Sequence, residues 1–184
     1  APSSLWSLVA AARFVRREAP FAFEPEPGPG GLLVTGVVDV LAHEPDGSVL
    51  VVDYKTNPLD VLEPPELTAR DYEGQRLVYA LAALRNGAPR VEVAHCYLER
   101  PDEPASAAYG PADAPALAER LVGLAGGLLA GDFAVTDVPH RELCGSCPGR
   151  RALCSHPEAL TLRPMPSVDT PAAADGPAAP RRAR

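Results

Sequence analysis

The sequence predicts an α/β fold, a mixed central sheet flanked by helices. With 184 residues and 46% hydrophobic content, the chain is long enough for one domain with a real core. Two neighbouring apolar runs separated by Asp46-Gly47 predict a β-hairpin. A segment with helical periodicity and a further apolar run then follow, which predicts a helix and another strand.

The N-terminal part is predicted to hold a helix and a short strand. Apolar residues recur at helical spacing over Leu5–Arg17. Three arginines end this helix and have two interpretations, a phosphate-facing patch or cations favoured by the helix dipole: Arg13, Arg16 and Arg17. Glu18–Phe23 is predicted to be an edge strand because it contains a proline.

The predicted hairpin fixes which residues face one another. Its first strand covers Leu32–Leu41 and contains Gly36, which indicates a bulge or a close backbone approach. The loop is His43–Gly47, and the second strand begins at Val49. A loop of about five residues places Asp39 opposite or diagonal to Asp53.

The rest of the chain continues the alternation of helices and strands. A helix is predicted over Glu66–Arg85, a strand over Val91–Leu98 and a small-residue helix over Ala114–Leu129. Residues 1–160 are predicted to form the main domain. Residues 161–184 contain little that could be buried, which predicts a disordered tail.

The second hairpin strand carries charge where a buried strand should be apolar. Asp53 and Lys55 are two residues apart, so they lie on the same face. Together with Asp39 they form a pair of carboxylates beside a lysine, which suits a site for Mg²⁺ or Mn²⁺ and phosphodiester hydrolysis. The alternative interpretation is a structural ion pair at a strand end.

Three motifs carry a resemblance to a known family. They are Gly36-Val37-Val38-Asp39, Val52-Asp53-Tyr54-Lys55-Thr56, and the helix from Tyr72 to Tyr79 with Gln75. In this order and at similar distances, they resemble the RecB/AddA branch of the PD-(D/E)XK nuclease superfamily. The resemblance implies a restriction-endonuclease-like core and a metal-dependent DNA exonuclease domain of an ATP-dependent helicase–nuclease that acts in double-strand break repair.

The resemblance also implies a role for each residue. Asp39 and Asp53 would bind the metal ion together with the backbone carbonyl of Tyr54, and Lys55 would be the catalytic lysine. Gln75 and Tyr79 would line the site and contact the DNA backbone. Members of the family usually carry one more ligand upstream, and Glu18 is the one candidate within Leu5–Phe23, where the alternative interpretation is the start of a strand.

Three cysteines near the C-terminus form a C-x2-C-x6-C pattern: Cys144, Cys147 and Cys154. His140 or His156 could complete a zinc site, and a cysteine before Ala1 could complete a [4Fe-4S] cluster. The pattern resembles iron–sulfur nucleases of the same superfamily. Cys96 is expected to be a buried hydrophobe, and His43 and His95 are expected to be surface or structural residues.

The net charge, the absence of long apolar runs and the first residues of the sequence bear on the expected location and partners of the chain. A formal net charge of −7 argues against a broad basic footprint on nucleic acid. No apolar run approaches the roughly 20 residues of a membrane span, and a cytoplasmic location is expected. The start at Ala1 suggests the C-terminal portion of a longer protein. DNA, a helicase domain and a second helicase–nuclease subunit are the expected partners. The alternative function is a non-catalytic module that binds DNA ends or docks a partner.

Overall fold

The structure, a computed structural model, describes residues 4–25, 32–59, 62–132 and 135–165. The chain divides into two compact units, residues 1–131 and residues 132–184. The first unit holds the sheet, and the second holds three of the four cysteines. The predicted boundary at residue 160 stays a prediction, and residues 166–184 of the predicted tail lie outside the described residues.

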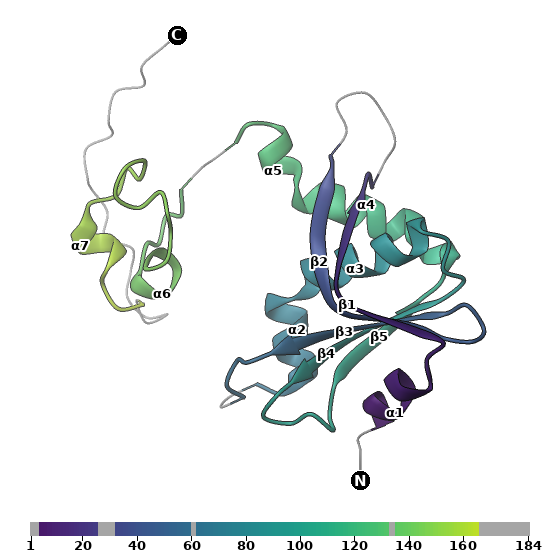
Figure 1. Cartoon of the computed structure of the whole chain (residues 1–184). Coiled ribbons are helices and arrows are strands. Elements are labelled where there is room, and N and C mark those ends of the chain that lie inside the picture. The colour runs from purple at the N-terminus through teal and green to yellow at the C-terminus, as the bar shows by residue number, and fades with distance from the viewer. Residues whose placement is uncertain (1–3, 26–31, 60–61, 133–134, 166–184) are drawn as a thin grey trace. The chain divides into compact units, whose positions relative to one another are not determined.

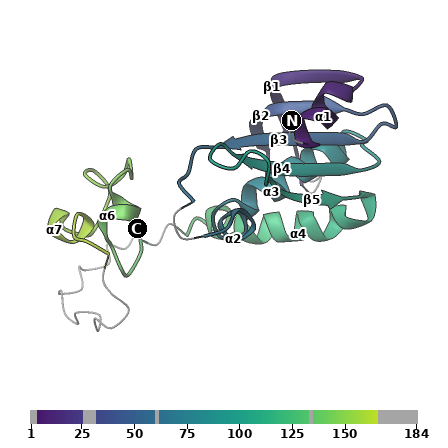
Figure 2. The ribbon, with the colours of Figure 1, turned by 90° about the horizontal axis from the view of Figure 1, so that it is seen from below.

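The first unit is built on one five-stranded mixed sheet in the order β1-β2-β3-β4-β5 (Figure 2). Its strands are β1 (Phe14–Phe23), β2 (Val34–His43), β3 (Val49–Lys55), β4 (Val91–Tyr97) and β5 (Ala105–Tyr109). β3 and β4 run parallel, and the other neighbouring pairs are antiparallel. This arrangement confirms the predicted α/β fold with a mixed sheet.

Helices cover both faces of the sheet (Figure 1). On one face α1 (Ser4–Ala11) packs Leu5 against a cluster that includes Val40, Leu50 and Val52. The opposite face is covered by α3 (Glu73–Arg85) and α4 (Ala114–Leu124). The shorter helices of this unit are α2 (Pro64–Asp71), η1 (Pro111–Asp113) and α5 (Gly126–Leu129). Within the described part of the chain, no helix combines the length and apolar character needed to cross a membrane.

The predicted helix over Leu5–Arg17 is wrong beyond Ala11. The Arg13 amide donates to the His43 carbonyl at 2.8 Å, and Phe14–Phe23 then pair with β2 as one long edge strand. Pairing with a neighbouring strand therefore overrides the local helical pattern. The arginines of this segment do not lie at a helix C-terminus, so the helix-dipole interpretation is also wrong.

Two further predicted helices are each interrupted. The helix predicted over Glu66–Arg85 is divided at Tyr72, whose backbone (φ −122°, ψ 10°) is not helical. The helix predicted over Ala114–Leu129 is divided into α4 and α5 at Ala125. β5 was not predicted at all, since its sequence Ala-Ser-Ala-Ala-Tyr is poor in the branched and aromatic residues that favour strands.

The predicted hairpin and its glycine are confirmed, but the bounds differ: the first strand, β2, runs from Val34 to His43, and His43 pairs with Val49 instead of belonging to the loop. Val40 pairs with Val52 and His43 with Val49, which is the register that brings positions 39 and 53 opposite each other. Gly47 turns the loop with φ 88°. A Cβ at Gly36 would lie 2.5 Å from Cζ of Phe21, so glycine lets the backbone approach this aromatic ring, and a larger residue would have to displace the ring.

The second unit is a small loop-rich body with two short helices, α6 (Arg141–Cys144) and α7 (Glu158–Thr161). Its two ends are joined where the Arg141 amide donates to the Arg163 carbonyl at 2.8 Å and Arg163 Nε donates to the Pro139 carbonyl. Arg150 pairs with Glu158 across it, N to O 3.0 Å. Backbone and ion-pair contacts therefore hold this unit.

Candidate active site

The centre of the site is the acid–base pair at the end of β3. Asp53 and Lys55 are 3% and 8% exposed, and Asp53 Oδ2 forms an ion pair with Lys55 Nζ. The side chains of β3 alternate between the two faces of the sheet, and Val49 and Val51 pack under α3. Asp53 and Lys55 continue this face, so the strand presents both charges toward α3. Buried charges need partners, and α3 supplies the rest of them.

Gln75 and Tyr79 lie one turn apart on α3 and complete the network. Gln75 Oε1 accepts a hydrogen bond from Lys55 Nζ at 2.7 Å, and its Nε2 donates to Asp53 Oδ1 at 3.1 Å. The amide therefore bridges the cation and the anion, which fixes its orientation. Tyr79 Oη accepts from Gln75 Nε2 at 2.8 Å and donates to Asp53 Oδ1 at 2.9 Å.

The environment keeps Tyr79 a hydrogen-bond donor. Its burial, with the negative charge of Asp53 added, raises the pKa of the Tyr79 hydroxyl well above the ordinary value of tyrosine. The proton consequently stays on Oη, where it is shared with a carboxylate, an arrangement stronger than a bond between neutral groups.

Asp39 reaches the site from β2. The ladder between β2 and β3 stops at Val40 and Val52, and Asp39 Oδ2 then accepts the backbone N–H of Tyr54 at 2.9 Å. The side chain thus satisfies a donor that strand pairing would otherwise satisfy. Its Oδ1 accepts no hydrogen bond from the part of the chain that the structure describes, so this oxygen is available to a ligand.

The rings of Tyr72 and His95 are stacked beside Lys55. Lys55 Nζ lies 3.8 Å from the centre of the Tyr72 ring, a cation–π contact. The Tyr72 ring stacks on His95 with centroids 5.7 Å apart, and its hydroxyl donates to Asn57 Oδ1 at 2.6 Å. The break between α2 and α3 at Tyr72 is where the chain turns this ring toward the sheet.

His95 is a member of the site that the sequence did not reveal. It is fully buried on β4, where it is the strand partner of Asp53, and its two ring nitrogens have no hydrogen-bond partner among the described residues. Burial, helped by the charge of Lys55, lowers the pKa of His95 to about 4, so the ring is neutral at pH 7. Only the parallel pairing of β3 with β4 could have placed it here.

The carboxylates fit a hard divalent cation. Mg²⁺ is usually held by one or two carboxylates, with water and substrate phosphates as its other ligands. Asp39, with one free oxygen, and Asp53 provide that donor set beside the backbone of Tyr54. In the described ranges no group of three or more His, Cys, Asp or Glu side chains is placed to hold a metal ion. Glu18 is exposed and belongs to no such group.

The three thiols of the second unit do not form a site as they are arranged. Cys144 is buried and Cys147 is exposed. The two histidines that could assist them are engaged elsewhere, His140 with Glu142 at 2.9 Å and His156 with the Thr136 carbonyl at 2.7 Å. A tetrahedral zinc site or a four-iron cluster needs four converging ligands, and this arrangement does not provide them. Cys96 is buried in β4 as expected.

The family model described as "PD-(D/E)XK nuclease superfamily" matches residues 1–154. Among solved structures, the protein SSO0001 is 18% identical with a TM-score of 0.40, over 65% of this chain and 55% of that one. A Eubacterium rectale protein named for an inferred exonuclease activity is 13% identical with a TM-score of 0.38, over 71% and 49%. The chain spans about half the length of both. No curated protein matches it.

Proposed function

This chain belongs to the PD-(D/E)XK nuclease superfamily, and from that premise we propose that it cleaves DNA phosphodiester bonds with the aid of Mg²⁺ or Mn²⁺. The observation that carries the proposal is the buried network in which Lys55, Gln75 and Tyr79 all converge on Asp53. Gln75 and Tyr79 satisfy the buried pair and hold it in one orientation, and Asp39 adds beside it a carboxylate oxygen that is available to a ligand.

Each residue of the network has a chemical task in this proposal. A bound divalent ion would supply a water of lowered pKa and neutralise charge on the phosphate oxygens. Asp39 and Asp53 would hold the ion with the Tyr54 carbonyl. Lys55 is the group that can donate a hydrogen bond to the phosphate oxygen on which negative charge develops.

Gln75 and Tyr79 set the position of the groups that act. Gln75 Oε1 restrains Lys55 Nζ, and Tyr79 Oη with Gln75 Nε2 orients the Asp53 carboxylate through its Oδ1. Asp53 Oδ2 has Lys55 Nζ as its one polar contact among the described residues, so Asp53 would hold a cation while Lys55 stays beside it to meet the substrate. We further propose that Gln75 and Tyr79 contact the DNA backbone once it is bound.

The test is cleavage of linear DNA with Mg²⁺ by the full chain and by Asp53→Asn. We expect Asp53→Asn to lower the cleavage rate at least about a hundredfold, because the amide loses the negative charge that holds both lysine and metal. Asp102→Asn makes the same chemical change at an exposed position and should cleave like the wild type. Equal cleavage by Asp53→Asn and wild type would instead favour the non-catalytic DNA-end-binding module.

We propose a RecB/AddA-like helicase–nuclease as the wider context, with a role in double-strand break repair and recombination. The support is the three motifs around Asp39, Asp53 and Gln75. A helicase in the same polypeptide or a partner subunit would then supply most of the DNA affinity, which suits an acidic chain. Degradation of linear duplex that depends on ATP would support this context. Cleavage that is indifferent to ATP in an assembly that contains this helicase would contradict it.

A [4Fe-4S] cluster on Cys144, Cys147 and Cys154 stays a proposal that rests on their spacing alone. It requires a fourth thiolate from outside these residues and a rearrangement that brings the thiols together. Iron and sulfide analysis of protein purified without oxygen tests it. If the protein contains stoichiometric zinc and no iron, the cysteines form a zinc site instead of a cluster. If it contains neither metal, the three cysteines are reduced thiols.

A further inference from the structure

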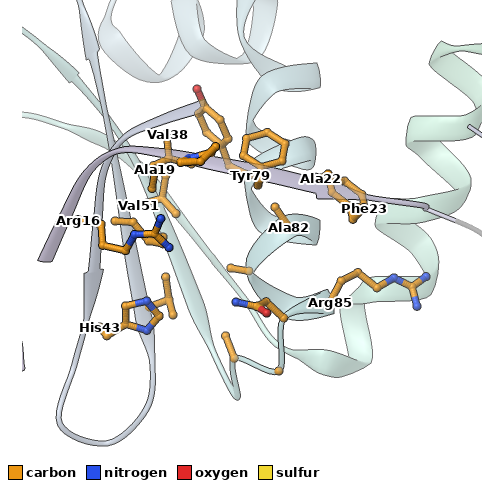
Figure 3. Close-up of a pocket in the computed structure, with 18 of the residues that line it drawn as sticks. Arg16, Ala19, Ala22, Phe23, Val38, His43, Val51, Tyr79, Ala82 and Arg85 are labelled. Atoms are coloured by element: carbon orange, nitrogen blue, oxygen red, sulfur yellow. The ribbon is translucent and has the colours of Figure 1, made fainter. Parts of the chain in front are cut away.

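β1 and β2 change the face that their side chains occupy halfway along. Side chains two apart on a strand should share a face. Val40 packs in the cluster beside α1, yet Val38 packs in the cluster beneath α3. Paired residues of neighbouring strands share a face, so β1 changes face together with β2: Arg17 pairs with Val40, whereas Ala19 pairs with Val38 and lines a pocket under α3 (Figure 3). Both strands are visibly bent in Figure 1.

The bend occurs at a single pair of positions. Arg17 pairs with Val40 and Ala19 pairs with Val38, so the register is unchanged across the bend. The positions between these pairs are Glu18 on β1 and Asp39 on β2. Glu18 has φ 48°, and it is the one non-glycine of the described residues with a positive φ. Such a backbone is disfavoured for any residue with a Cβ, and bulge-like residues of this kind re-aim the strand beyond them.

The bend has two consequences for the site. Beyond the bend, β1 and β2 pack against α3. The Val37 carbonyl of β2 lies 3.3 Å from Tyr79 Oη, and the Phe21 ring of β1 packs edge-on against the Tyr79 ring. At the bend, Asp39 leaves the ladder with β3, and its carboxylate reaches the Tyr54 N–H. A straight strand would continue pairing with β3 past Val40 and would bond the Tyr54 N–H through its own backbone.

We propose that the left-handed backbone of Glu18 positions the carboxylate of Asp39, which makes Glu18 a positioning residue of the metal site. The inference rests on the proposed function, since Asp39 matters for catalysis only if it binds metal. Glu18 acts through its backbone: its side chain is exposed and has no ion pair or hydrogen bond with the described residues. The rival interpretation is that the Glu18 carboxylate itself binds the metal.

The two interpretations are separated by substitutions at Glu18, with Mn²⁺ binding by the full chain without DNA as the readout. Glycine and asparagine tolerate a left-handed backbone, and β-branched valine does not. We expect Glu18→Gly and Glu18→Asn to bind Mn²⁺ as tightly as the wild type or tighter, and Glu18→Val to bind at least about tenfold more weakly. Arg16→Val places the same side chain on β1 where the backbone is not left-handed, and it should bind like the wild type.

Two outcomes overturn the proposal. Wild-type affinity in Glu18→Val would show that the backbone does not matter. An equal loss in Glu18→Gly, Glu18→Asn and Glu18→Val would show that the carboxylate is the ligand. If Glu18→Val does not fold, Glu18→Ala replaces it in the series. The proposal is then overturned if Glu18→Ala binds Mn²⁺ as tightly as Glu18→Gly or tighter.

A second readout needs no metal. The Tyr54 amide should exchange with solvent faster in Glu18→Val than in wild type, because the Asp39 carboxylate no longer accepts its hydrogen. Unchanged exchange overturns the positioning role. Faster exchange in a protein whose wild type does not bind Mn²⁺ would instead support the bend and contradict the proposed function, so the two failures are distinguishable.

Discussion

The neutral, buried His95 predicts a specific loss of stability in acid. In the folded chain the pKa of His95 is about 4, whereas an unfolded histidine has a pKa of about 6.5. Between these values the unfolded chain binds a proton that the folded chain does not. The stability that the neutral ring confers is therefore complete above about pH 6.5 and is lost as the pH falls toward 4.

The magnitude follows from the two pKa values. Each pH unit in this interval removes about 1.4 kcal/mol from the free energy of unfolding, which amounts to about 2 kcal/mol by pH 5 and about 3 kcal/mol by pH 4. Against the roughly 5–15 kcal/mol that stabilises an ordinary domain, this is a large fraction.

The variant His95→Phe isolates the effect, because phenylalanine keeps a flat ring against Tyr72 and has no proton to bind. Urea unfolding of the metal-free proteins is measured at several pH values from 7 to 4. We expect the difference in unfolding free energy between wild type and variant to shift by about 3 kcal/mol in favour of the variant over this range. Parallel curves would refute the reasoning, and so would an NMR titration of the His95 ring near pH 6.5.

Three more predictions test particular contacts. Tyr79→Phe removes one of the donors to Asp53 Oδ1 and should lower the free energy of unfolding by about 1–3 kcal/mol and slow Mg²⁺-dependent cleavage, with unchanged urea midpoints as the contrary result. Gly36→Ala should destabilise by about 1–3 kcal/mol because its Cβ would meet the Phe21 ring, and Phe21→Leu should restore part of the loss if that contact is the cause. Thr68→Val leaves the buried Tyr97 hydroxyl unpaired and should destabilise by about 1–3 kcal/mol; in a double-mutant cycle, adding Tyr97→Phe should recover most of it, and strict additivity would contradict the shared hydrogen bond.

The part of the site that sequence predicted depends on local rules. The Asp46-Gly47 turn fixes the loop length, which places Asp39 next to the last paired position of β2 and across from the end of β3, and the two-residue period of strands puts Lys55 on the face of Asp53. Helical spacing likewise places Gln75 and Tyr79 on one side of α3. These relations hold because each depends only on residues near in sequence or joined by a tight turn.

The remainder depends on contacts between distant segments. The chain turns from α1 into β1 at Ala12 and Arg13 because β2 accepts the following residues as a partner, and no local pattern marks that change. Tyr72 leaves the helix where its ring meets His95 from another strand. The left-handed backbone of Glu18 has no signal either, since glutamate seldom adopts it.

The bend at Glu18 also affects how the chain behaves beside its own copies. β1 is an edge strand, and an edge that is long, flat and uncharged invites pairing with strands of other molecules. Here the edge carries exposed charges at Arg16, Arg17 and Glu18, a proline at Pro20, and a kink between its halves. No straight row of free amides and carbonyls is left long enough to template another strand. The distortion that we propose positions the Asp39 carboxylate thereby also disfavours the pairing of this edge with strands of other molecules.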